Sequence, residues 1–173
     1  MKNIKSWNNY PRIQHNSTIE FSKNIDFSSN KVDSFLVHGL GRSYGDVCLN
    51  ENGNLILTKN LKEIIDFDIQ AGTIKCEAGL SIKEILNFIV PFGWFLPVVP
   101  GTRNVTIGGA IANDIHGKNH HNSGSFGNYI NSIKLLRSND DLLYCSDSEN
   151  SDYFRATIGG LGLTGIILEA EIK

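Results

Sequence analysis

The chain has 173 residues, of which 40% are hydrophobic and 20% are charged, and its formal net charge at pH 7 is −2. This composition is typical of one globular domain, or at most two small ones, and it gives no indication of a nucleic-acid partner. The sequence has neither a signal-peptide pattern nor the roughly 18 consecutive apolar residues of a spanning helix, so we expect a cytoplasmic location. Cys48, Cys76 and Cys145 form no C-x-x-C pair. This spacing favours reduced, buried thiols over a disulfide framework or a zinc ribbon.

The N-terminal part differs in composition from the remainder of the chain. Residues 1–31 are polar and rich in Asn and Ser, and we expect an irregular arm anchored mainly by Trp7 and Tyr10. A folded domain is expected over residues 32–173, where the apolar runs are as short as those of strands. We predict strands at residues 35–37, 55–57, 73–76, 95–99, 130–136, 142–145 and 163–172.

Signals for helices are fewer. Ser81-Ile82-Lys83-Glu84 is a capping box, and it predicts a helix that ends at Pro91 and Gly93. A second, short helix is predicted at residues 151–157. Strands separated by so few helices indicate an α+β fold rather than a doubly wound parallel sheet.

The glycine-rich segment at residues 38–46, HGLGRSYGD, follows a predicted strand. Its backbone N–H groups can form a nest around a pyrophosphate, and Arg42 and Ser43 can add donors. It is not a dinucleotide-binding fingerprint, because Tyr44 stands where the third glycine of G-x-G-x-x-G belongs, and the spacing of a Walker A loop is absent. A tight turn between two strands is the alternative.

A longer segment at residues 101–128, GTRNVTIGGAIANDIHGKNHHNSGSFGN, has almost no amphipathic periodicity. Its small residues at 106–110 offer either a surface on which a ligand lies flat or a site of close strand packing. His116 and His120 have the i, i+4 spacing of metal ligands, but Gly117 and Asn119 disfavour a helix there, and no Cys or Glu completes a set. We therefore predict no metal site. Asp114 either orients His116 or satisfies a turn.

A third glycine cluster, GGLGLTGII at residues 159–167, leads into the last predicted strand. Together, GLGRSYGD, PGTRNVTIGGAIANDIHGKNHHNSGSFGN and IGGLGLTGII resemble the FAD-binding (PCMH-type) domain of the vanillyl-alcohol oxidase superfamily. The resemblance covers residues 34–173 and is strongest to the decaprenylphosphoryl-β-D-ribose oxidase branch, since IHGKNHH and SGSFGN are specific to that branch. It implies an α+β fold with two small β-sheets and flanking helices.

The resemblance also implies which residues contact FAD. In the first loop they are Val37, His38, Gly39, Leu40, Gly41, Arg42, Ser43, Tyr44, Gly45, Asp46 and Val47, and beyond it Gly101, Thr106, Ile107, Gly108, Gly109, Asn113, Asp114, Ile115, His116 and Ile167. His116 and Tyr44 are the candidate catalytic residues, and Gly117 and Lys118 would border the substrate. Many relatives attach the flavin to a histidine after the second glycine of the first loop. Arg42 occupies that position here, so the FAD is expected to be noncovalent.

The implied activity is oxidation of a ribose 2'-hydroxyl to a ketone by hydride transfer to the flavin. The substrate would be a polyprenyl-phosphate sugar, a cell wall polysaccharide precursor, and an NAD-dependent reductase would act on the product. A lipid substrate also implies association with a membrane surface. Two alternatives are a noncatalytic flavin-binding module and an FAD-dependent oxidase of another sugar or alditol. Family members are longer and carry a substrate-binding domain, so we expect the isolated chain to be incomplete and inactive alone.

Overall fold

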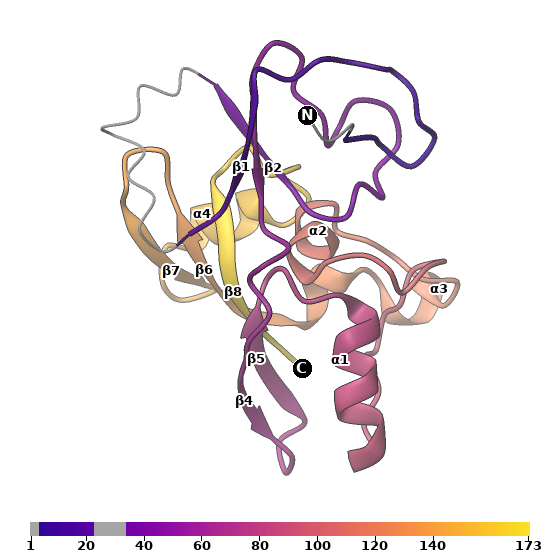
Figure 1. The fold of residues 1–173 in the computed structure, drawn as a ribbon. Helices are drawn as coiled ribbons and strands as arrows, with labels where there is room; N and C mark the ends of the chain where they lie inside the picture. The colour runs from indigo at the N-terminus through magenta and orange to yellow at the C-terminus, as the bar shows by residue number, and fades with distance from the viewer. Residues whose placement is uncertain (1–3, 23–33) are drawn as a thin grey trace.

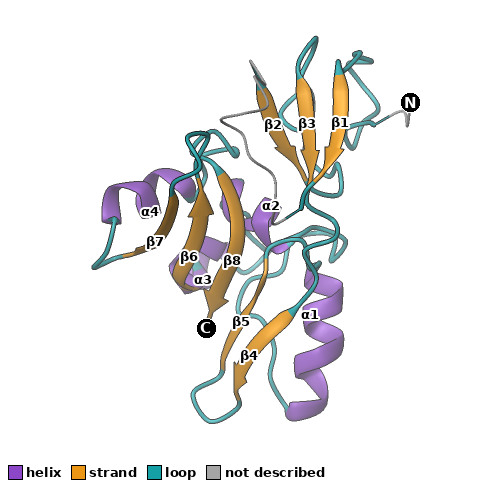
Figure 2. Ribbon diagram, turned by 60° about the vertical axis from the view of Figure 1, so that its left-hand side comes forward, coloured by secondary structure: helices purple, strands orange, loops and turns teal. Residues whose placement is uncertain are grey.

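The computed structural model describes residues 4–22 and 34–173, and the first three strands of these ranges form a parallel sheet (Figures 1 and 2). The strands are β1 (Ser17–Glu20), β2 (Phe35–His38) and β3 (Asn54–Leu57), in the order β1-β3-β2. Both outer strands pair with β3 at the same four residues. Leu55 and Ile56, in the central strand, are fully buried.

Strand β1 lies inside the segment that we expected to be irregular. Its side chains alternate between half-buried and exposed, but four residues are too few for that period to be recognised in a polar sequence. The segment becomes a strand because the edge of β3 is available to pair with it, which is a contact with residues about 37 positions away. Residues 1–3 and 23–31 of the expected arm lie outside the described residues, and the boundary between the arm and the domain stays a prediction.

The second sheet is antiparallel and has five strands in the order β4-β5-β8-β6-β7. These are β4 (Ile64–Asp68), β5 (Thr73–Glu77), β6 (Ile130–Leu136), β7 (Leu142–Ser146) and β8 (Ile166–Ile172). The last strand in the sequence is thus central, between β5 and β6. The predicted strands of this sheet are confirmed, although β8 begins three residues later than expected. Strand β4 was missed because a register shift between Ile64 and Asp66 interrupts its alternation.

The predicted strand at residues 95–99 is wrong. This segment has no regular secondary structure, bends at Pro97 and joins no sheet. Pro97 has no N–H to donate to a ladder, and the nearby Pro100 limits the segment further. An apolar run that resembles a strand is therefore a connection between the first helix and the second glycine-rich segment.

The helices flank the two sheets as the α+β prediction requires. Helix α1 (Ile82–Ile89) begins with the predicted capping box: Ser81 Oγ accepts from the Glu84 N–H, and the Glu84 carboxylate accepts from the Ser81 N–H. A short 3₁₀ turn, η1 (Val90–Phe92), follows and ends at Gly93, whose φ is +84°. The other helical segments are α2 (Ile107–Ala112), α3 (His120–Ser123), η2 (Phe126–Tyr129) and α4 (Ser151–Thr157), and α4 has the predicted bounds.

Helix α2 lies between the two sheets (Figure 2). Ile107 and Ile111 are fully buried in the main core, which α1, α2 and the five-stranded sheet share. A smaller core joins Phe21 and Ile56 of the parallel-sheet region to Ile166 at the start of β8. No helix in the described part of the chain is both long enough and apolar enough to cross a bilayer.

Candidate functional site

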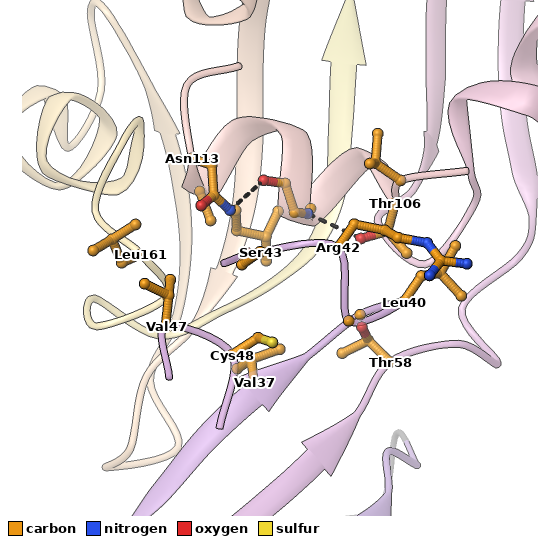
Figure 3. A pocket seen from close by; sticks show the side chains of 18 of the residues that line it. Val37, Leu40, Arg42, Ser43, Val47, Cys48, Thr58, Thr106, Asn113 and Leu161 are labelled. Atoms are coloured by element: carbon orange, nitrogen blue, oxygen red, sulfur yellow. Dashed lines mark hydrogen bonds between the residues drawn. The ribbon is translucent and has the colours of Figure 1, made fainter. Parts of the chain in front are cut away.

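A cleft of about 390 Å³ opens between the parallel sheet, α2 and the start of β8 (Figure 3). Glycines and apolar side chains make up most of its walls, which is typical of small-molecule sites. It is lined by Val37, Gly39, Leu40, Gly41, Arg42, Ser43, Tyr44, Val47, Cys48, Thr58, Ala78, Val105, Thr106, Gly108, Gly109, Ala112, Asn113, Ile115, Leu161, Gly162, Gly165 and Ile167. All three glycine-rich segments of the sequence therefore meet at one cleft.

The loop after β2, residues 39–48, forms one wall of the cleft. The loop approaches α2 so closely that a Cβ on Gly39 would lie 2.6 Å from Thr106 Oγ1. At its base, the His38 ring is buried and its Nδ1–H donates to the Cys48 carbonyl oxygen over 2.7 Å. Burial lowers the pKa of His38, so the ring is neutral at pH 7. The loop is thus held by close packing against Thr106 and by a hydrogen bond between its two ends.

Several backbone N–H groups of this loop have no hydrogen-bond acceptor among the described residues. The N–H groups of Leu40, Gly41, Arg42 and Tyr44 donate to no other residue in the described ranges. The Ser43 N–H lies near the Cys48 thiol, and this proximity acts to lower the pKa of that thiol against the larger, opposite effect of burial. Unpaired amides grouped in a glycine-rich loop form an anion-binding nest, and a phosphate is the group that best satisfies several of them at once.

Helix α2 forms the floor of the cleft and offers no comparable donors. The N–H groups of Ile107 and Gly108 donate to carbonyl oxygens that precede α1, and that of Gly109 donates to Thr106 Oγ1 over 3.0 Å. What α2 presents is a surface of small residues, on which a planar group can lie. At its end, Asn113 Nδ2 donates to the Gly109 carbonyl over 2.8 Å, which fixes the Asn113 side chain beside the cleft (Figure 3).

The third wall is the loop that leads into β8. Its amides hold it to the end of α2, since Gly159 N–H donates to the Ile111 carbonyl and Leu161 N–H to the Ala112 carbonyl. Leu161 has a φ of +54° and Gly162 of +79°. A Cβ on Gly162 would lie 4.0 Å from that of Val37 on the opposite wall. The backbone conformation here depends on the tertiary contact with α2.

Most of the predicted cofactor residues lie in this cleft, but some lie elsewhere. His38 and Ile107 are buried beneath its walls. Gly45 and Asp46 lie in the turns after the exposed Tyr44 and are not among the lining residues. Gly101 lines a separate hollow with Phe95, Pro97 and Lys118.

Asp114 and His116 also lie outside the cleft, although Ile115 between them lines it. Asp114, at a φ of +40°, turns its carboxylate away, and Oδ1 accepts from the Gly127 N–H over 2.8 Å. Asp114 therefore satisfies a turn and does not orient His116. The exposed His116 forms an isolated bridge with Ser125, and its ring centroid lies 5.4 Å from that of His120. Across the described residues, no group of three His, Cys, Asp or Glu side chains is arranged to hold a metal ion.

Eight lining residues were absent from the sequence-based prediction: Cys48, Thr58, Ala78, Val105, Ala112, Leu161, Gly162 and Gly165. Small and apolar side chains carry no chemical signal of their own. Those at residues 161–165 lie in a glycine cluster that the sequence did single out, but nothing in it indicated which of its residues face a cleft. The other five come from the ends of separate elements that only folding brings together.

Comparison with known proteins gives a consistent result. Residues 13–146 match the model of a family described as FAD binding domain. Decaprenylphosphoryl-beta-D-ribose oxidase of Mycolicibacterium smegmatis is 46% identical over 139 residues, which are 80% of this chain and 30% of that protein. The match to a putative D-arabinono-1,4-lactone oxidase of Neurospora crassa is 27% over 161 residues, 93% of this chain and 29% of that protein. Delta(24)-sterol reductase of Rattus norvegicus is 29% identical over 114 residues, 66% of this chain and 22% of that protein.

These comparisons show how much of its relatives the chain covers and where the shared region begins. The chain spans between 22% and 30% of the length of the three relatives. The family match begins at residue 13, earlier than the resemblance we expected from residue 34, and it includes β1. The strand at the edge of the parallel sheet is thus within the region that the family shares.

Proposed function

This chain belongs to the FAD binding domain family, and we propose that it is the flavin-holding part of an oxidase that acts on a polyprenyl-phosphate ribose. The relative from Mycolicibacterium smegmatis, whose name states that substrate class, supports the proposal through its 46% identity. When bound, FAD would supply the acceptor for the hydride from the ribose 2' carbon, and the 2'-hydroxyl would give its proton to a base, which leaves a ketone. The product would be a cell wall precursor that an NAD-dependent reductase consumes, and the lipid chain of the substrate would bring the enzyme to a membrane surface.

The cleft carries the cofactor part of the proposal. The amides of Leu40, Gly41, Arg42 and Tyr44, which are unpaired among the described residues, would donate hydrogen bonds to the pyrophosphate oxygens. The flavin and ribityl groups would lie along α2, where the glycines at 108 and 109 allow close approach. The loop after β2 offers unpaired N–H groups for a diphosphate, whereas the first amides of α2 are already hydrogen-bonded and leave a surface of small residues for a ring. This difference is the single observation that most favours FAD here.

We further propose that the FAD is bound without a covalent bond. The Arg42 guanidinium lies over the Trp7 ring, and its Nε–H donates to the Asn104 carbonyl. No histidine is among the lining residues, and Cys48 is the one thiol there. Burial raises the pKa of Cys48, which leaves it a protonated and poor nucleophile.

Tyr44 and His116 remain the candidates for contact with the reacting groups. Tyr44 is 71% exposed where it lines the cleft, so its ring is available to a flavin or a substrate. His116 is exposed beyond Ile115, where it would approach a substrate rather than the pyrophosphate. Because the chain spans 30% of its oxidase relative, turnover is proposed for the whole protein, and the 173-residue chain is expected to bind FAD without oxidising the sugar.

A second candidate is an FAD-dependent oxidase of another sugar or alditol. The similarity to a putative D-arabinono-1,4-lactone oxidase over 93% of this chain favours it. The two candidates share the flavin site and differ in the substrate, which the remainder of a longer protein would select. A noncatalytic flavin-binding module would bind FAD equally well but support no turnover in the whole protein.

The decisive experiment is the visible spectrum of the purified chain with added FAD, followed by acid precipitation. We expect twin flavin bands whose colour passes to the supernatant. Colour in the pellet would contradict noncovalent binding, and absence of any FAD binding would refute the cofactor assignment. Tyr44→Ala should shift the bound flavin bands, whereas Tyr144→Ala, at an exposed tyrosine of β7 that lies outside the cleft, should leave them in place.

A further inference from the structure

The segment at residues 5–10, here called the N-terminal strap, is folded into a compact turn. The Ser6 side chain is buried, and its Oγ lies 3.0 Å from Asn8 Oδ1 and 3.2 Å from the Tyr10 carbonyl oxygen. The Asn9 N–H donates to the Ser6 carbonyl. The strap precedes the family match, which begins at residue 13. Segments near a chain terminus are ordered only where they form contacts with the rest of the fold, so we asked which residues the strap contacts.

The contacts of the strap are concentrated on the loop after β2, which its trace follows in Figure 1. The Trp7 N–H donates to the Ser43 carbonyl over 3.0 Å, and Asn8 Oδ1 accepts from the Gly45 N–H over 3.2 Å. The Lys5 carbonyl oxygen approaches Gly41 so closely that a Cβ there would overlap it. Gly41 has a φ of +64°, so the strap packs at the point where the loop needs glycine.

Arg42 extends this contact to the segment before α2. Its guanidinium carbon lies 5.2 Å from the centroid of the Trp7 ring, and its Nε lies 3.3 Å from the Asn104 carbonyl oxygen. Arg42 thus joins the strap to the segment that leads into α2. The Trp7 ring on the strap thus contacts the side chain that links the first loop to the segment before α2.

We infer that the N-terminal strap is a positioning element of the cofactor site, with Trp7 as its principal positioning residue. The inference rests on the proposed FAD function. The strap occupies the Ser43 carbonyl and the Gly45 amide, while the amides of Leu40, Gly41, Arg42 and Tyr44 stay unpaired among the described residues. A loop held in this state does not lose conformational freedom when a diphosphate binds, which raises affinity without any direct contact from the strap.

The test compares four versions of the full chain: the unaltered protein, Trp7→Ala, Trp7→Phe and Trp94→Ala. Trp94 is the matched control, because it is the other tryptophan, is partly exposed and donates to the Ile69 carbonyl away from the cleft. Hydrogen–deuterium exchange measures the amides of residues 40–45 without ligand. Fluorescence titration gives the Kd for FAD, and competition gives the Kd for ADP, which carries the same diphosphate without a flavin.

Trp7→Ala should raise exchange at Gly45, the loop amide that the strap holds, and weaken FAD and ADP equally, by about fivefold, the effect of about 1 kcal/mol of lost cation–π and packing energy. Trp7→Phe should restore part of both effects, and Trp94→Ala should change neither. Unchanged loop exchange in Trp7→Ala would overturn the inference, as would faster exchange with unchanged Kd values. If the unaltered chain bound no FAD, the proposed function would fail, and the exchange result alone would still decide whether the strap orders the loop.

Discussion

Gly39→Ala tests the close approach between the first loop and α2. The added Cβ would lie 2.6 Å from Thr106 Oγ1 and 3.3 Å from Thr106 Cγ2. Thr106 is 3% exposed and cannot simply rotate into solvent, and its Oγ1 caps α2 by accepting from the Gly109 N–H. The substitution should therefore displace the cap as well as crowd the wall of the cleft.

The expected cost follows from these contacts. Loss of a Thr cap costs about 1 kcal/mol, overpacking adds roughly 1 to 3 kcal/mol, and the stiffer unfolded chain returns about 0.5 kcal/mol. A net loss of about 2 kcal/mol lowers the Tm of a domain of this size by roughly 4–8 °C. Gly101→Ala is the matched control, since a Cβ there meets no atom within 4 Å and its φ is not positive. It should change the free energy of unfolding by less than about 0.5 kcal/mol.

A double-mutant cycle tests the contact between Gly39 and Thr106 by measuring the free energy of unfolding in urea. Thr106→Ala alone should cost about 1 kcal/mol through loss of the cap. Gly39→Ala combined with Thr106→Ala should cost little more than Thr106→Ala alone, because the Thr106 Cβ is 3.5 Å from the added methyl group, an ordinary contact. Additive costs would show that the clash does not exist, and equal costs for Gly39→Ala and Gly101→Ala would refute the packing argument.

Two further predictions concern titration and thiol chemistry. Partial burial raises the pKa of Glu84, but hydrogen bonds from Lys62 and Ser81 outweigh this effect and hold the pKa at about 2. The ionised carboxylate therefore stabilises the fold at pH values above its unfolded pKa of about 4.3. This stabilisation is lost as the pH falls toward 2. Between pH 5 and pH 2.5 the unaltered chain should lose about 1 kcal/mol more than Glu84→Gln in urea unfolding, a figure reduced for solvent screening, and parallel curves would contradict this. Burial raises the pKa of Cys76 to about 12, so Cys76 should react with a thiol reagent only after denaturant is added. Slow labelling of Cys48 in the folded chain should be suppressed further by FAD, and equal labelling with and without FAD would place the ligand outside the cleft.

Local interactions explain what could be predicted for the fold. The capping box predicted α1 because all its groups lie within four residues, and the apolar runs predicted β2, β3, β5, β6 and β7 because each run matches the length of a strand. Elements that depend on distant partners were missed. Strand β1 exists through its pairing with β3, and α2 exists because Ile107 and Ile111 are buried and its first amides bond to residues before α1. Its two glycines made a helix the least expected structure for that segment.

The sequence by itself determined the chemical character of the site and its family. The glycines at 39 and 41 and the neighbouring Arg42 predict a loop that binds a ligand, because the freedom of a glycine backbone and the charge of an arginine belong to the residues themselves. Only the tertiary structure decided which of the glycine-rich residues share the cleft. Gly39 and Gly101 each lie in a glycine-rich segment and were both predicted to contact FAD. In the structure, Gly39 packs closely against Thr106, whereas a Cβ on Gly101 would meet no atom within 4 Å. The placement of the N-terminal strap on the loop after β2 depends on contacts between residues more than thirty positions apart, and no local pattern encodes such a distance.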